Sequence, residues 1–168
     1  DRNYVKTDDV YEQFGNKRSE LKYGMCTVSI PHDHKIGHIE SPSIWRFEFS
    51  EDPKKHVVLH TTKVMEKDAF FKTLSTNVKN SPKKSSFLFV HGYNTSFGDA
   101  AKRTAQISYD LLFEGESVFY SWPSQANVAE YTRDEANIKW AETNIKNFLE
   151  DYITRSQAEE IYLVAHSM

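Results

Sequence analysis

The residues most suited to chemistry stand where an apolar run, 161–165, is followed by His166, Ser167 and Met168. Five apolar residues before a polar bend indicate a buried strand that ends in a sharp turn. In the pattern G-x-S-x-G, such a turn exposes a serine hydroxyl above a sheet because small residues flank it. Ala165 takes the first small position, and the given sequence stops one residue short of the second. Ser167 is therefore a candidate nucleophile.

Two other predicted strands also end in polar or small residues. The run 87–90 leads into His91-Gly92, and the run 118–120 leads into a Ser-Trp-Pro-Ser sequence at 121–124. In an open α/β sheet, ligands bind outside the carboxyl ends of the strands, so we expect all three ends to meet at one rim. This arrangement suits acyl transfer, in which a serine attacks and two backbone N–H groups hold the oxyanion.

The expected oxyanion donors are the N–H of Met168 and the N–H of Gly92 or Tyr93. Trp122 and its neighbour Pro123 fit either a pocket wall or plain packing. Five residues beside the strand ends are candidates for lining a pocket: His91, Asn94, Trp122, Ser124 and His166. His91 is expected to shape its loop by hydrogen bonding rather than to act as a base.

The first third of the chain is expected to be antiparallel. Residues 1–20 are polar and predict an irregular lead-in, whereas 21–30 predicts a strand that ends at a proline. The segment 44–50 alternates aromatic and polar residues, a period of two that is typical of an antiparallel strand with one solvated face. Another short strand is predicted at 57–59.

The rest of the chain alternates helices and strands. Helical periodicity starts at Glu66, and Ser96 with Asp99 forms a capping box that predicts a helix through about Leu112. A long helix with one apolar stripe follows the 121–124 sequence. Such alternation predicts parallel strands with right-handed crossovers. We therefore expect a single mixed α/β domain, antiparallel over 1–64 and built of βαβ units over 65–168.

The composition limits the classes of partner. The 168 residues are 39% hydrophobic, which is enough for one domain with a core. A formal charge of −3 gives no case for nucleic acid or an anionic membrane, and no apolar run approaches the roughly 20 residues of a membrane span. The single cysteine, Cys26, excludes an internal disulfide and favours a reducing compartment such as the cytoplasm. Its apolar strand indicates a structural thiol.

Two groups of titratable residues are weaker candidates. His32, His34 and His38 could suggest zinc, but they lack a cysteine partner and a helically spaced glutamate, so no metal and no cofactor is expected. Asp134 and Glu135 follow the 121–124 sequence, where a solvated or helix-terminus role is favoured over that of a catalytic acid.

Three stretches, 89–97, 120–124 and 163–168, resemble a bacterial family of α/β hydrolases of esterase or lipase type whose function is unknown. The front of the chain is similar too, at 1–2, 21–24, 28–31 and 34–40. The resemblance implies an incomplete α/β-hydrolase fold over 1–168, with Ser167 as the nucleophile and a small-molecule or lipid ester as the substrate. It also implies that the acid and the histidine of the triad follow Met168, because in this fold they come after the nucleophile.

Three expectations follow from where the sequence stops. The 168-residue chain alone should be nearly inactive as an esterase, since a serine without a base is a poor nucleophile. The final strand should present an open apolar edge, and self-association or pairing with a separate C-terminal piece would cover it. A peptidase, amidase or acyltransferase on the same fold, or a non-catalytic binding or scaffold module, is the alternative function.

Overall fold

The computed structural model describes residues 1–127 and 130–166, in which eleven elements follow one another along the chain. The antiparallel part holds β1 (Arg2–Tyr4), β2 (Phe14–Arg18), β3 (Tyr23–Ser29), the 3-10 helix η1 (Ile44–Arg46) and β4 (Val58–Met65). The βαβ part holds α1 (Lys67–Asn80), β5 (Ser85–Val90), α2 (Phe97–Asp110), β6 (Glu116–Tyr120), α3 (Tyr131–Arg155) and β7 (Glu160–Ala165). The fold is mixed α/β, as expected.

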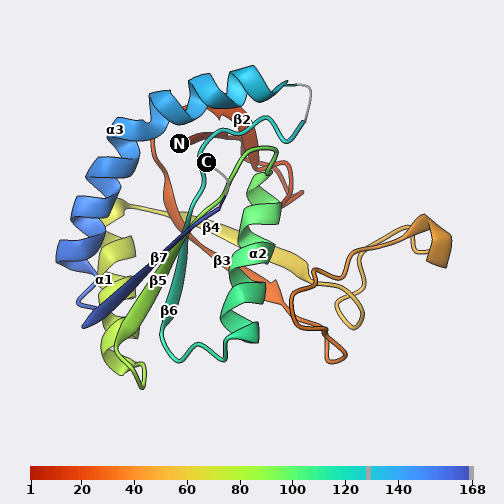
Figure 1. Ribbon diagram of the computed structural model, residues 1–168, viewed down its shortest axis with the longest axis horizontal. Helices are drawn as coiled ribbons and strands as arrows, with labels where there is room; N and C mark the ends of the chain where they lie inside the picture. The colour runs from red at the N-terminus through yellow and green to blue at the C-terminus, as the bar shows by residue number, and fades with distance from the viewer. Residues whose placement is uncertain (128–129, 167–168) are drawn as a thin grey trace.

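A three-stranded parallel sheet in the order β6-β5-β7 forms the centre of the molecule. All six residues of β5 are buried, because a strand lies on each side of it and helices cover both faces. Figure 1 shows α1 and α3 on one side of this sheet and α2 on the other. The helix α2 begins at the expected capping box, in which Ser96 accepts from the N–H of Asp99.

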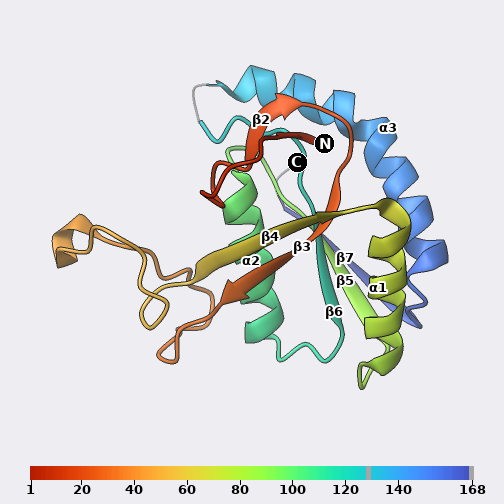
Figure 2. The ribbon, with the colours of Figure 1, turned by 180° about the vertical axis from the view of Figure 1, so that it is seen from behind.

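Two antiparallel pairs precede the parallel sheet. β3 and β4 form a hairpin that crosses behind the parallel sheet, as Figure 2 shows from the other side. β1 pairs with β2, so the prediction of an irregular lead-in over 1–20 was wrong for these two strands. Their polar sequences hide the pairing because only a few of their side chains are buried, Arg2 above all.

Residues 31–56, which we call the arm, project from the body between β3 and β4 (Figures 1 and 2). The strand predicted at 44–50 is wrong: the segment forms η1 and an irregular turn. Phe47 has a left-handed φ of 55°, which ends any extended conformation. No described strand pairs with 44–50, so alternation alone did not make a strand there.

The main core lies between α1, α3 and the face of the parallel sheet that they cover. Its buried side chains come from both helices, from β5 and β6, and from the loop after β6: Phe71, Leu74, Val78, Leu88, Val90, Tyr120, Trp122, Ala141, Phe148 and Tyr152. The hydroxyl groups of Ser86 and Tyr152 bond to each other within this region. Within the described residues, no helix is both long and apolar enough to cross a membrane.

The strand β7 differs from the buried strand that its sequence predicts. It pairs with β5 through a register that joins Val90 to Ala165, yet Tyr162 is 49% exposed and Leu163 is 57% exposed. Among the described residues β7 has one neighbouring strand, which leaves these two side chains in solvent. The apolar run therefore identified a strand correctly but misjudged its burial.

Candidate functional site

The carboxyl ends of the three parallel strands meet at one rim, as the sequence predicts. Val90 of β5 lies beside Tyr120 of β6 on one side and Ala165 of β7 on the other. The N–H of His166 donates to the carbonyl of Val90 over 3.1 Å, which fixes the end of β7 against the start of the loop after β5. Ser167 and Met168, the expected nucleophile and one expected oxyanion donor, lie outside the described residues.

Arg2 of β1 is the centre of a buried hydrogen-bond network behind this rim. Its Nε donates to Ser121 Oγ over 2.7 Å, and its two terminal nitrogens donate to the carbonyls of Thr95 (2.6 Å), Gly15 (3.1 Å) and Ser124 (3.1 Å). Burial lowers the pKa of Arg2 to about 10, so the guanidinium stays charged at neutral pH. One side chain thus ties the loop after β5 to the loop after β6.

His91 lies inside the same network, and its ring is neutral. Its Nδ1 faces the carbonyl of Gly92 at 2.9 Å, so Nδ1 carries the proton and donates. Nε2 then accepts from Ser121 Oγ at 3.1 Å and faces Arg2 at 3.4 Å. Burial, together with the nearby charge of Arg2, lowers the pKa of His91 to about 3. Both ring nitrogens are therefore occupied within the protein, which leaves His91 no free lone pair for a substrate proton.

Asp134 holds the other side of the loop after β5. It lies in the first turn of α3 and is buried, which corrects the expectation of a solvated carboxylate, whereas its helix-terminus position agrees with that expectation. Its carboxylate accepts from the N–H of Asn94 (3.0 Å), from Ser124 Oγ (2.6 Å) and from the N–H of Gln125 (2.7 Å). Glu135, its neighbour, forms an exposed ion pair with Lys139.

The loop after β5 offers two backbone donors that are not used elsewhere. Within the described residues the N–H groups of Gly92 and Tyr93 form no hydrogen bond, whereas those of Asn94 and Thr95 are bound by Asp134 and Ser124 Oγ. Asn94 has a left-handed φ of 54°, which turns the chain at this point. The fixed turn therefore presents neighbouring N–H groups, the kind of donor that an oxyanion needs.

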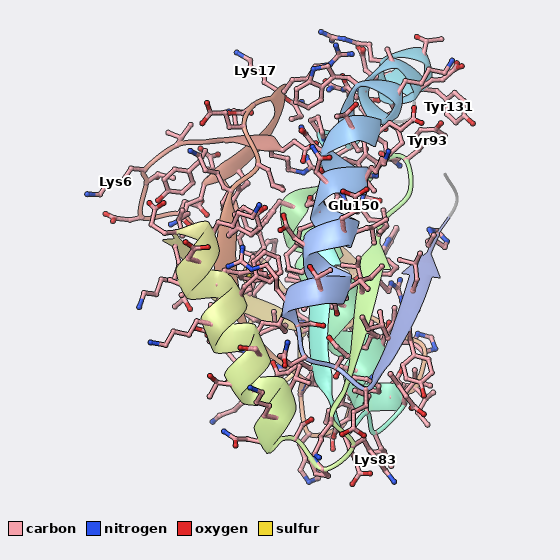
Figure 3. The ribbon with its side chains drawn as sticks, turned by 90° about the vertical axis from the view of Figure 1, so that its left-hand side faces the viewer. Lys6, Lys17, Lys83, Tyr93, Tyr131 and Glu150 are labelled. Atoms are coloured by element: carbon pink, nitrogen blue, oxygen red, sulfur yellow. The ribbon has the colours of Figure 1, made fainter. Side chains whose placement is uncertain are left out.

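Aromatic rings support this turn from below and beside it. His91 stacks on Trp122 with ring centroids 5.1 Å apart, and Trp122 Nε1 donates to the carbonyl of His91 over 2.7 Å. Tyr93 packs edge-on against Trp122 and lies 4.6 Å from the ring of Tyr131 in α3. Figure 3 shows Tyr93 and Tyr131 together beside the start of this helix. Trp122 is fully buried, so its contacts are those of packing.

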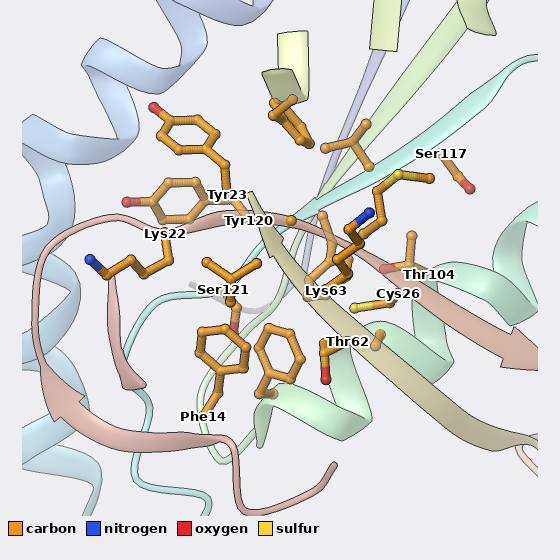
Figure 4. Close-up of a pocket in the computed structure, with 18 of the residues that line it drawn as sticks. Phe14, Lys22, Tyr23, Cys26, Thr62, Lys63, Thr104, Ser117, Tyr120 and Ser121 are labelled. Atoms are coloured by element: carbon orange, nitrogen blue, oxygen red, sulfur yellow. The ribbon is translucent and has the colours of Figure 1, made fainter. Parts of the chain in front are cut away.

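A cavity of about 370 Å³ lies between the β3–β4 pair and β6 (Figure 4). Aromatic and aliphatic side chains dominate it, and Tyr23, Phe14, Thr62 and Cys26 lie around it. Burial raises the pKa of Cys26 to about 12, so its thiol stays protonated. Ser121 and Arg2 also border the cavity, whereas none of the five candidate pocket-lining residues does. Their pocket role stays a prediction.

The histidine cluster separates in the structure. His32 is exposed beside Asp33, while the ring of His34 is buried between Glu40 and Asp110, with both ring nitrogens 2.8 Å from a carboxylate oxygen. Over residues 1–127 and 130–166, no group of three or more histidine, cysteine, aspartate or glutamate side chains is placed to hold a metal ion.

The fold and the site together define a mixed α/β protein whose candidate centre lies at the carboxyl ends of parallel strands, as in α/β hydrolases. A family model described as an alpha/beta hydrolase of unknown function (DUF900) matches residues 66–168. This match covers more than half of the sequence, so the chain belongs to that family, which confirms the prediction of an α/β-hydrolase family of unknown function. No curated protein and no solved structure matches the chain.

Sequence reasoning missed the two charged residues that hold the site together. Arg2 stands in a segment with no apolar pattern, and Asp134 looks like any acidic residue at a helix start. A usable hint existed for Asp134, since it comes ten residues after Ser124 and opens the long helix. For Arg2 the hint was the resemblance at residues 1–2, but nothing in the sequence pairs Arg2 with partners that lie 93 to 122 residues away.

Proposed function

We propose that this chain carries the nucleophile of a serine hydrolase that cleaves acyl esters through an acyl-enzyme at Ser167. The main support is the meeting of the β7 end with the loop after β5, where His166 bonds to Val90 and the N–H groups of Gly92 and Tyr93 have no partner among the described residues. Ser167 directly follows His166 in sequence, and the proposal is that it acts beside these donors.

The proposed reaction has two halves. Ser167 Oγ attacks the ester carbonyl, and the N–H groups of Met168 and of Gly92 or Tyr93 stabilise the oxyanion. The triad histidine takes the proton from Ser167 Oγ and gives it to the departing alcohol; it then takes a proton from the water that attacks the acyl-enzyme and returns that proton to Ser167 as the acid is released. His91 does not serve as the base in this proposal, because its ring nitrogens bond to Gly92, Ser121 and Arg2.

A fluorophosphonate probe tests the nucleophile directly, because it labels only activated serines. We expect labelling of the full-length protein that is abolished by Ser167→Ala and kept by Ser75→Ala, which removes an exposed hydroxyl on α1. A panel of short acyl esters, amides and peptides would then separate an esterase from a peptidase, amidase or acyltransferase. Labelling that survives Ser167→Ala would contradict the proposal.

A binding module without catalysis is the second candidate, and the cavity of about 370 Å³ favours it. This volume lies in the range of small-molecule sites, which run from about 300 to 1,000 Å³. In that case the full-length protein would bind apolar ligands but would give no serine labelling.

A further inference from the structure

At the tip of the arm, residues 44–49, large apolar side chains are exposed to solvent while a carboxylate is turned inward. Ile44, Trp45, Phe47 and Phe49 are between 79% and 95% exposed, and Trp45 is the most exposed of the four. The carboxylate of Glu48, which stands between the two phenylalanines, is instead turned inward with its side chain only 15% exposed. Exposed apolar groups that gather in one place mark an interaction surface more often than isolated ones do.

The tip is held in this conformation by internal bonds. Glu48 Oε2 accepts from the N–H of Ser43 (3.2 Å), from Arg46 Nε (3.0 Å) and from the buried ring of His56 (3.2 Å). The other ring nitrogen of His56 accepts from the N–H of Asp52 over 2.9 Å. These bonds hold the backbone of the tip in one conformation. The exposed aromatic side chains are therefore attached to a backbone of defined shape.

A polar groove of about 630 Å³ lies on the same arm, where His38 and four cationic side chains line it: Lys35, Arg46, Lys54 and Lys55. Within the described residues, the ammonium groups of the three lysines form no ion pair. Asp33, Glu40 and Glu48 also line the groove, but Glu40 and Glu48 are engaged by His34, Arg46 and His56. The groove thus offers free positive charge, although the chain as a whole has a formal charge of −3.

We propose that the arm, residues 31–56, docks on an anionic phospholipid surface. Trp45, Phe47 and Phe49 would insert at the level of the headgroups, where aromatic rings are favoured, and the lysines of the groove would face the phosphates. A convex tip suits a lipid surface better than a protein partner, because a stable protein interface needs about 800 Å² on each side. Figures 1 and 2 show the tip standing clear of the body, so it can reach a flat surface. The proposal does not depend on the chemistry of Ser167.

Sedimentation with vesicles of phosphatidylcholine, with and without phosphatidylserine, tests the docking on the full chain. We expect binding that needs phosphatidylserine and weakens at least about tenfold in Trp45→Ala/Phe47→Ala. Lys54→Gln/Lys55→Gln should weaken vesicle binding about 25-fold at low ionic strength, which is about fivefold for each lysine. Lys6→Gln/Lys17→Gln, which removes two exposed charges elsewhere, is the matched control and should change it little (Figure 3).

Tryptophan fluorescence gives a second measurement that does not depend on folding defects. Trp45 is exposed and Trp122 is buried, so in a Trp140→Phe background a blue shift on vesicles reports the surroundings of Trp45. We expect that shift with phosphatidylserine vesicles, and quenching by brominated lipid. The proposal is overturned if vesicles do not bind, if the tip variants bind as well as the parent, or if the same variants abolish a dimer in solution instead.

Discussion

Asp134 shows how one side chain can fix a loop that it does not belong to. Its carboxylate receives a backbone N–H from the loop after β5, a hydroxyl from Ser124 and the N–H of Gln125 from the loop after β6. The two loops come from neighbouring strands, and the helix that carries Asp134 starts only after both. Because the carboxylate is buried, each of these donors would otherwise lack a partner.

Replacing Asp134 with asparagine should destabilise the protein by about 2 to 3 kcal/mol, because an amide nitrogen would face donors where an oxygen accepts. Urea unfolding followed by circular dichroism measures the change. Glu135→Gln is the control: it removes a neighbouring charge from an exposed ion pair and should cost less than about 1 kcal/mol. Equal losses in the two variants would argue against a special role for Asp134.

At the scale of elements, sequence periodicity predicted the βαβ part well. The capping box at Ser96 located the start of α2 because it is a local interaction between residues three apart. The strands β5 and β6 were predicted because continuous apolar runs are needed where helices cover a sheet. These patterns depend on near neighbours, which the sequence displays directly.

The failures at this scale have one physical cause. The segment 44–50 has the alternation of a strand but no described strand to pair with, and Phe47 takes a left-handed conformation. β1 and β2 pair although their sequences show no alternation, since their stability comes from distant contacts such as those of Arg2. The candidate site follows the same rule: the loops were predicted, but not the two charges that hold them.

His34 joins the base of the arm to the end of α2, and this contact depends on pH. Its protonated ring donates to Glu40 and to Asp110, and Asp110 also accepts from the N–H of Gly37. Burial alone would lower the pKa of His34, but the hydrogen bonds to the two carboxylates outweigh it and raise the pKa. The backbone bond from Gly37, with the bonds from Gln106 and His34, lowers the pKa of Asp110.

The stabilisation from His34 should therefore be complete below about pH 6.5, where an unfolded histidine is also protonated, and should be lost as the pH rises through the raised pKa. The stabilisation from the carboxylates of Glu40 and Asp110 is present above about pH 4, and it is lost as the pH falls through their lowered pKa values. We expect His34→Gln to cost more stability at pH 5.5 than at pH 8.5, measured by urea unfolding. His60→Gln, on an exposed ring, should show no such dependence.

At the scale of the whole molecule, Arg2 connects the antiparallel part to the site on the parallel sheet. Its guanidinium reaches the loops after β5 and β6 and a carbonyl of β2 at the same time. The carboxylates of Asp134 and Asp99 supply the nearest opposing charge in this buried position. The planar fork of arginine can serve several acceptors at once, which a single ammonium cannot do.

Arg2→Met should destabilise the protein by about 3 to 5 kcal/mol, because the variant leaves buried carbonyls and the Asp134 charge without their cation. Arg18→Gln removes an arginine of similar reach from the partly exposed contact with Asn137, and its cost should stay below about 1 kcal/mol. Chemical unfolding of both variants gives the comparison. If Arg2→Met costs no more than Arg18→Gln, the network does not stabilise the native state as described.

The distance along the chain between Arg2 and its partners also sets an order of events during synthesis. Arg2 and the carbonyl of Ser124 are separated by 122 residues, so they cannot meet until all the residues between them have been made. At about 5 to 20 residues per second, that interval lasts about 6 to 25 seconds. Throughout it the arginine stays hydrated, and closing so long a loop is slow because its entropy must be overcome first. The rim of the sheet should therefore become ordered only after the loop that follows β6 has been made.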